Sequence, residues 1–255
     1  MKLSGNTVLI TGGTSGIGYE FAIQLLKLGN VVLITGRDQS RLEQAKKSLP
    51  AIHTFQSDVS DSKEIQFLYN AVVETFPALN VLINNAGIMR KINLLKEEDG
   101  LEYITGEIET NLMGTVRMVK QFLPLLESQE SAAIVNVSSG LAFVPLPIAP
   151  VYCAAKAGVH SFTQSLRVQL KDTRISVFEL APPMTRTPLF ARDIHVEDMK
   201  GVPMMTASKM VGEAIRGLEK DRLEIHPGMS NVLRLMSRIA PHFILKRLSK
   251  SVSEP

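Results

Sequence analysis

Short apolar runs rich in β-branched residues alternate with helix-length segments along almost the whole chain. Seven of these runs are predicted to be strands: Thr7–Ile10, Val31–Thr35, His53–Gln56, Val81–Ile83, Ala133–Val137, Ile175–Leu180 and Leu223–Ile225. Parallel strands need crossover connections, and strands that are apolar on both faces need helices on both sides. The alternation therefore predicts a single α/β domain with a doubly wound parallel β-sheet.

Composition excludes several classes of protein. The 255 residues, 45% of them hydrophobic, are enough for one core, and 28 Lys and Arg against 25 Asp and Glu do not make a nucleic-acid-binding surface. The single Cys153 excludes an internal disulfide and offers no metal-ligand pair, so no metal site is expected. No apolar run reaches membrane-spanning length and no signal peptide is recognisable, so we expect a soluble, cytoplasmic protein.

A glycine-rich turn, TGGTSGIG at residues 11–18, stands between the first predicted strand and an amphipathic helix. In a doubly wound sheet, ligands bind beyond the carboxyl ends of the strands, where this turn lies. Gly12 permits a tight turn, Gly16 lets the backbone approach a diphosphate, and Gly18 lets the helix pack closely on the strand. The spacing differs from the G-x-G-x-x-G dinucleotide pattern, so a purely structural turn is the alternative that this motif alone leaves open.

Four further motifs follow in order: NNAG at 84–87, Asn111 in ETNLMGT, Ser139 in NVSSG, and YCAAK at 152–156. Together with the glycine turn, they resemble the signature of the short-chain dehydrogenase/reductase family over roughly residues 5–228. The stretches ELAPPM and SSGLAF are similar to bacterial members of the DltE type. The resemblance implies a Rossmann-type fold and an NAD(P)-dependent oxidoreductase that acts on a small carbonyl or alcohol.

The candidate catalytic residues are Asn111, Ser139, Tyr152 and Lys156. Tyr152 and Lys156 are one helical turn apart, so their side chains share a face. A lysine cation and a positive nicotinamide ring would lower the pKa of tyrosine, which makes Tyr152 the candidate general acid in reduction and general base in oxidation. Ser139, thirteen residues before Tyr152, is favoured over Ser138 to hold the substrate oxygen. By resemblance, Lys156 also binds the nicotinamide ribose, and Asn111 helps hold a water molecule for a proton relay.

The resemblance also implies which residues hold the dinucleotide. They are Gly12, Ser15, Gly16, Ile17, Gly18, Arg37, Asp58, Val59, Asn85, Ala86, Gly87, Tyr152, Lys156, Pro182 and Thr187. Gly36 stands where NAD-preferring members have Asp, and Arg37 follows it, so we predict NADP as the preferred cofactor and NAD as the alternative. Arg37 is also compatible with an ordinary surface residue. The resemblance implies an adenine contact for Asp58, which is also compatible with the N-cap of the next helix, and the two roles do not exclude each other.

Apolar residues near Ser139 and Tyr152 predict a hydrophobic or aromatic substrate. They are Leu141, Ala142, Phe143, Val144, Pro145, Leu146, Pro147 and Met184. The following stretch, at about 188–209, has loop composition and is predicted to be a lid. Pro183 stands where the family has Gly, which alters how the backbone meets the nicotinamide amide.

The resemblance fades after residue 229, so we expect a dehydrogenase domain at 1–229 and a tail at 230–255. The tail has five Lys or Arg against one Glu, with apolar residues between them. This pattern is compatible with contact to an anionic membrane surface. Such a tail more often packs on its own domain or on a partner subunit, and Pro241 interrupts the helix. Family members pair through helices that lie here at about 101–126 and 151–170, which implies a homodimer or homotetramer. The alternatives to an enzyme are a non-catalytic nucleotide-binding sensor or scaffold, and a membrane-surface protein that acts through its basic tail.

Overall fold

The computed structural model describes residues 1–95, 100–190 and 203–250. Its centre is a seven-stranded sheet in the order β3-β2-β1-β4-β5-β6-β9, and every neighbouring pair is parallel. The strands are β1 Thr7–Ile10, β2 Val31–Gly36, β3 His53–Gln56, β4 Leu79–Asn84, β5 Ala132–Val137, β6 Ile175–Leu180 and β9 Glu224–Ile225. The predicted doubly wound α/β class is therefore confirmed.

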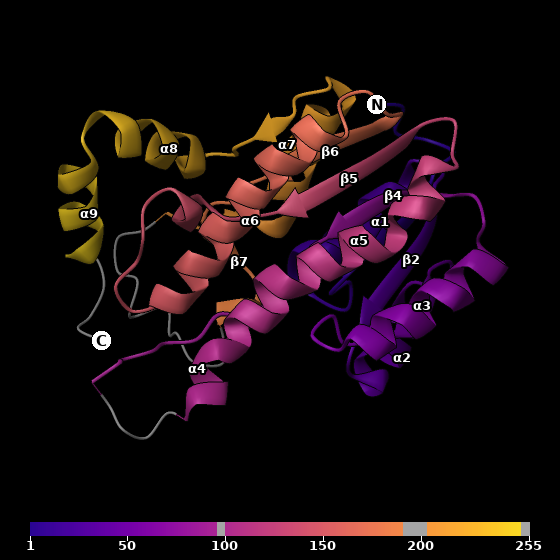
Figure 1. Cartoon of the computed structure of the whole chain (residues 1–255), viewed down its shortest axis with the longest axis horizontal. Coiled ribbons are helices and arrows are strands. Elements are labelled where there is room, and N and C mark those ends of the chain that lie inside the picture. Colours follow the sequence, from indigo (N-terminus) through magenta and orange to yellow (C-terminus); the bar gives the residue numbers. More distant parts are fainter. Residues whose placement is uncertain (96–99, 191–202, 251–255) are drawn as a thin grey trace.

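Helices cover both faces of this sheet (Figure 1). They are α1 Gly16–Lys27, α2 Gln39–Ser48, α3 Ser62–Thr75, α4 Leu101–Ile108, α5 Gly114–Glu127, α6 Pro150–Gln169, α7 Ala207–Glu219, α8 Met229–Ile239 and α9 Pro241–Ser249. Among the described residues, no helix is both long enough and apolar enough to cross a membrane.

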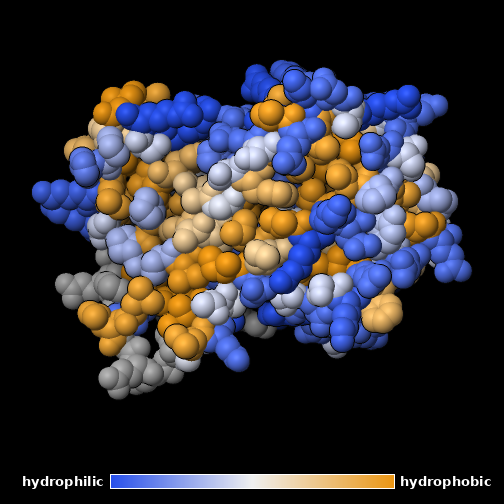
Figure 2. Space-filling view, viewed as in Figure 1, coloured by the Kyte–Doolittle hydropathy of each residue, from blue (hydrophilic) through white to orange (hydrophobic). Residues whose placement is uncertain are grey.

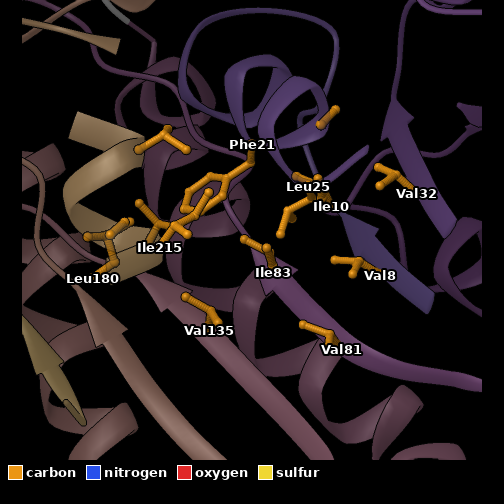
Figure 3. Packing of buried hydrophobic residues seen from close by; sticks show 14 of the residues in the cluster. Val8, Ile10, Phe21, Leu25, Val32, Val81, Ile83, Val135, Leu180 and Ile215 are labelled. Carbon is orange, nitrogen blue, oxygen red and sulfur yellow. The ribbon is translucent and has the colours of Figure 1, made fainter. Parts of the chain in front are cut away.

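Two hydrophobic clusters hold the helices on the sheet. Val8 points to one face, where it joins Phe21 of α1 and Ile215 of α7 (Figure 3). The next residue, Leu9, points to the opposite face and joins a cluster that includes Phe122 of α5. Successive strand side chains alternate between faces, so the continuously apolar strands supply a core on each side.

Buried amides fix α6 relative to the central strands. Asn84 Nδ2 donates to Asn136 Oδ1 at 2.9 Å, and Asn136 Nδ2 donates to Thr163 Oγ1 at 3.0 Å. Buried amides without partners would destabilise the fold, so this chain of hydrogen bonds favours one arrangement of β4, β5 and α6. The first turns of α6 are thereby positioned at the carboxyl edge of the sheet.

Some short elements are not predicted by the sequence pattern. A π-helix, η1 Glu109–Met113, joins α4 to α5, and strands β7 Thr185–Arg186 and β8 Met205–Thr206 form a separate parallel pair. β7 lies just before the predicted 188–209 lid and β8 lies within it, so the pair connects the lid to the segment that precedes it. Residues 191–202 of that lid lie outside the described residues, and the last part of the range, from Ala207, belongs to α7.

Candidate active site

A cavity of about 450 Å³ lies at the carboxyl edge of the sheet. The predicted site residues on its wall are Gly12, Ser15, Gly16, Ile17, Arg37, Asp58, Val59, Asn85, Ala86, Gly87, Ser139, Tyr152, Lys156, Pro182 and Thr187. Gly18 and Asn111 are packed behind this wall. Residues predicted from widely separated motifs are thus brought together by the ends of six strands, β1 to β6.

The turn between β1 and α1 is shaped to receive an anion. Gly12 has a φ of +65°, and a Cβ there would lie 2.8 Å from the Ala86 Cα. Ser15, the N-cap residue of α1, makes no side-chain capping bond in the described structure, and the first turn contains no acidic residue. The free N–H groups and the positive end of the helix dipole therefore suit the diphosphate of a dinucleotide.

The NNAG motif braces this turn. Asn85 Nδ2 donates to the carbonyl oxygens of Thr11 and Gly12 at 3.0 and 3.1 Å. Thr11 Oγ1 accepts from the backbone N–H groups of Asn85 and Ala86, both at 3.0 Å. At Gly18, a Cβ would lie 2.5 Å from both Asn85 Nδ2 and the Gly12 oxygen. Gly18 therefore permits the close packing of α1 that its position in the motif predicts.

Tyr152, Lys156 and Ser139 meet at the centre of the cavity. Tyr152 and Lys156 are buried on α6, and Lys156 Nζ lies 5.8 Å from the centroid of the Tyr152 ring. Lys156 Nζ donates to the Val137 carbonyl at 2.9 Å. Ser139 follows β5 directly, and its Oγ accepts from the Leu141 N–H at 3.1 Å.

Burial dominates the electrostatics of this group. It raises the pKa of Tyr152, and a hydrogen bond with the Ser139 hydroxyl opposes that rise. It also lowers the pKa of Lys156 to about 8. The site residues alone therefore do not produce the lowered tyrosine pKa that we expected, because loss of solvation is the largest effect on Tyr152.

Asn111 lies in the π-helix η1 and is fully buried. Its Oδ1 accepts from the Ile88 N–H and its Nδ2 donates to the Ile88 carbonyl, both at 2.8 Å. A Cβ on the neighbouring Gly87 would lie 3.1 Å from Asn111 Oδ1 and 3.6 Å from Lys156 Nζ. Asn111 therefore holds the loop after β4 beside Lys156.

Ser138 differs from Ser139 in its partner. Ser138 Oγ donates to Glu179 Oε1 at 2.5 Å, and Glu179 Oε2 pairs with His160 Nδ1 at 2.7 Å. Burial acts to raise the pKa of Glu179, but hydrogen bonds from His160 and Ser138 hold the pKa below its ordinary value. Ser138 and Ser139 both line the cavity, but this network already engages the Ser138 hydroxyl, which favours Ser139 as the residue that meets a substrate.

Glu179 and His160 are not among the residues predicted from the sequence. The only signal is a charged residue inside the apolar strand ISVFEL, together with a histidine one helical turn after Lys156. Their pairing depends on how α6 packs on β6, which neither local pattern describes.

Charged residues surround the end of the cavity near β2. Arg37 is 54% exposed, and its Nη1 lies 3.8 Å from Asp58 Oδ2. Asp58 Oδ1 accepts from the N–H and the hydroxyl of Ser60 at 2.9 and 2.7 Å. The alternative role of Asp58 as an N-cap is wrong, because α3 begins later and Asp61 caps it.

Arg41 and Asp38 were also missed, and both line the cavity. Asp38 caps α2 by accepting from the Arg41 N–H at 3.1 Å, and its other oxygen lies 3.5 Å from Arg41 Nε. The signal in the sequence is a second arginine one helical turn after Arg37. It supplies a second cation near this end of the cavity.

Apolar side chains form the other end of the cavity. Leu141, Leu146 and Met184 are there as predicted, whereas Ala142, Phe143, Val144, Pro145 and Pro147 are not on its wall. Phe143 instead packs edge-on against the rings of His160 and His226, at centroid distances of 5.0 and 5.4 Å. The wall is completed by residues the motifs did not reveal, namely Met89, Leu189, Met229, Leu233 and Leu248. The last three come from α8 and α9.

Comparison with known proteins agrees with this arrangement. Residues 6–197 match the family model described as short chain dehydrogenase. The chain belongs to the short-chain dehydrogenase family. It is 46% identical over 227 residues to the uncharacterized oxidoreductase DltE of Bacillus subtilis (strain 168), an alignment that covers 88% of this chain and 89% of that protein.

Solved structures of the family extend the comparison. A short chain dehydrogenase from Burkholderia cenocepacia J2315 in complex with NADP has a TM-score of 0.84 at 25% identity, covering 97% of this chain and 99% of that one. A family member from Burkholderia phymatum in complex with NAD has a TM-score of 0.81 at 22% identity, covering 100% of this chain and 99% of that one, and supports the fold. This short-chain dehydrogenase is therefore an NAD(P)-dependent oxidoreductase that acts on small molecules.

Proposed function

We propose that this short-chain dehydrogenase transfers a hydride between NADP(H) and the carbonyl/alcohol pair of a small hydrophobic molecule, with Tyr152 as general acid and base. The observation that carries the proposal is the convergence of Tyr152, Ser139 and Lys156 on the cavity that receives the start of α1. One cavity thus combines a proton donor with a place for a diphosphate.

The roles of the side chains follow from their positions. Ser139 donates a hydrogen bond to the substrate oxygen and holds it towards Tyr152. Tyr152 gives its proton to that oxygen during reduction and takes it back during oxidation. Lys156 stabilises the resulting phenolate through its positive charge, and Asn111 keeps the adjoining loop in place. A nicotinamide cofactor bound in this cavity would supply the hydride chemistry, and in its oxidised form it would add a positive charge that favours the phenolate of Tyr152.

Replacing Tyr152 with phenylalanine tests the mechanism. The ring volume is retained, so we expect unchanged cofactor affinity and a loss of turnover of at least about 100-fold. Tyr69→Phe is the control, because Tyr69 packs on Phe122, 5.3 Å between centroids, and is absent from the described cavity wall. Full activity in Tyr152→Phe would refute the mechanism.

Arg37 and Arg41 support the preference for NADP. Both line the end of the cavity beside β2, and Gly36 places no carboxylate at the end of that strand to repel a 2′-phosphate. Asp58 competes weakly with a phosphate for Arg37, because Asp58 Oδ2 lies 3.8 Å from Arg37 Nη1 and this ion pair is partly exposed. Separate dissociation constants for NADPH and NADH test this preference, and a lower constant for NADH would contradict it.

The apolar end of the cavity supports a hydrophobic substrate. Leu141, Leu146 and Met184 leave few polar partners for a charged or heavily hydroxylated molecule there. A panel of hydrophobic aldehydes and ketones, assayed by NADPH absorbance beside sugar phosphates of similar size, tests the substrate class. Faster turnover of the sugar phosphates would contradict the proposal.

A homodimer or homotetramer is the proposed assembly, with contacts through α4, α5 and α6. Figure 2 shows many apolar side chains on the face where these helices lie in Figure 1. Leu101 at the start of α4 and Val168 near the end of α6 are exposed. In a two-fold symmetric contact, this surface on each subunit would be buried against the same surface of the other subunit. Light scattering coupled to size-exclusion chromatography tests this assembly, and a monomer at micromolar concentration would refute it.

A further inference from the structure

The outer side of α8 and the start of α9 carry exposed apolar residues. Val232, Leu235 and Ile239 are 44, 56 and 69% exposed and follow one another at helical spacing, and Phe243 in the first turn of α9 is 58% exposed. The inner side of the same helices is attached to the protein, since Leu233 and Leu248 line the cavity and Ile244 is buried. The two helices lie together at one end of the molecule (Figure 1).

Cations accompany these apolar residues. Between His226 and Lys250 the sequence contains five Lys or Arg and no Asp or Glu. Arg234 is held by Glu224, whereas Arg238, Lys246, Arg247 and Lys250 are exposed and make no ion pair within the described residues. Figure 2 shows apolar and strongly hydrophilic atoms side by side at this end of the molecule.

We propose that the face formed by Val232, Leu235, Arg238, Ile239, Phe243 and Lys246 docks on the surface of an anionic phospholipid bilayer. Apolar side chains of such a helix reach the boundary of the acyl chains, while Lys and Arg bind the lipid phosphates. An anionic bilayer therefore provides partners both for the positive charges of the face and for its apolar side chains.

A second copy of the chain fits the face less well. A two-fold contact places the same surface of each subunit against the other, so cations would oppose cations with no carboxylate between residues 226 and 250 to separate them. Docking on lipid instead uses none of the proposed catalytic residues. It also places the wall formed by Leu233 and Leu248 close to the membrane.

Vesicle co-sedimentation of the full chain tests the proposal. We expect binding to vesicles that contain phosphatidylglycerol, little binding to phosphatidylcholine alone, and weakening at high salt. Each cation near an anionic surface contributes about fivefold in affinity, so the double variant Arg238→Glu/Lys246→Glu should lose at least about 25-fold. Leu235→Ser/Ile239→Ser should lose at least about tenfold by removing buried apolar area.

The matched control changes the same kinds of residue on α3, namely Phe67→Ser, which is 71% exposed, with Lys63→Glu in the first turn. This variant should bind as the wild type does, and circular dichroism checks that every variant is folded. Absence of binding, equal binding to neutral vesicles, or equal losses in the control would overturn the proposal. Self-association that the α8 variants abolish, without any vesicle binding, would assign the face to a second copy and overturn it too.

Discussion

Replacing Lys156 with methionine is expected to stabilise the fold while it removes activity. Lys156 is 4% exposed, and burial lowers its pKa from 10.5 to about 8. This difference in pKa corresponds to about 3 kcal/mol, by which burial of the cation lowers the free energy of unfolding at pH 7. Methionine keeps the apolar stem but loses the hydrogen bond to Val137, a loss of about 1 kcal/mol. The free energy of unfolding should therefore rise by about 2 kcal/mol.

The gain should depend on pH in a defined direction. The folded pKa of Lys156 lies below the unfolded one, so the folded chain releases its proton first as pH rises from about 8 towards 10.5. The free-energy cost of burying the cation in the wild type therefore decreases with pH, and it should fall below about 1 kcal/mol by pH 10. The stability advantage of the variant should shrink by a similar amount.

Urea unfolding followed by circular dichroism at pH 7 and pH 10 measures both effects. Lys120→Met, at an exposed position within α5, is the control and should change stability by less than about 0.5 kcal/mol at either pH. A Lys156→Met variant that is less stable than the wild type at pH 7, or whose gain is the same at both pH values, would show that the cost of burial has been misjudged.

Three further substitutions test other parts of the account. Gly12→Ala should abolish cofactor binding and lower the unfolding free energy by more than about 2 kcal/mol, whereas Gly5→Ala, with a φ of +73° and open space, should lose only about 1 kcal/mol; equal losses would contradict the close contact at Gly12. Arg37→Ser should raise the Kd for NADPH about tenfold and leave the Kd for NADH unchanged in a fluorescence titration. The exposed control Arg174→Ser should change neither Kd, and equal weakening of NADPH and NADH binding by Arg37→Ser would refute the phosphate contact. Glu179 has a pKa below its ordinary value, so its ionised form contributes stability above about pH 4.3 that is lost as pH falls through the folded pKa; Glu179→Gln should flatten this acid dependence, and an unchanged slope in urea titrations would argue against it.

The strands and the central catalytic group could be predicted because their signals are local. Runs such as TVLI and VVLIT are long enough to reveal buried strands, and the turn at Gly12 follows one of them directly. Tyr152 and Lys156 are one turn apart, so helix geometry alone puts them on the same face. The family resemblance then related them to Ser139, which lies on a different element.

Features that depend on tertiary packing could not be predicted in this way. Glu179 is a charged residue in an apolar strand, and only the packing of α6 explains how His160 offsets its burial. Two aspartates lie three positions apart in SDVSD, and the point at which α3 begins decides that Asp61 and not Asp58 is the cap. Leu233 and Leu248 reach the cavity because α8 and α9 fold back beside it, beyond the last family motif.

The central claim is that the cavity binds a nicotinamide dinucleotide and prefers NADPH. A fluorescence titration of the purified full-length chain with NADPH and, separately, with NADH tests it most directly. We expect saturable binding of both, with a Kd for NADPH at least about tenfold lower. Binding of neither cofactor would contradict the account and favour a protein that keeps the fold and its motifs without the chemistry.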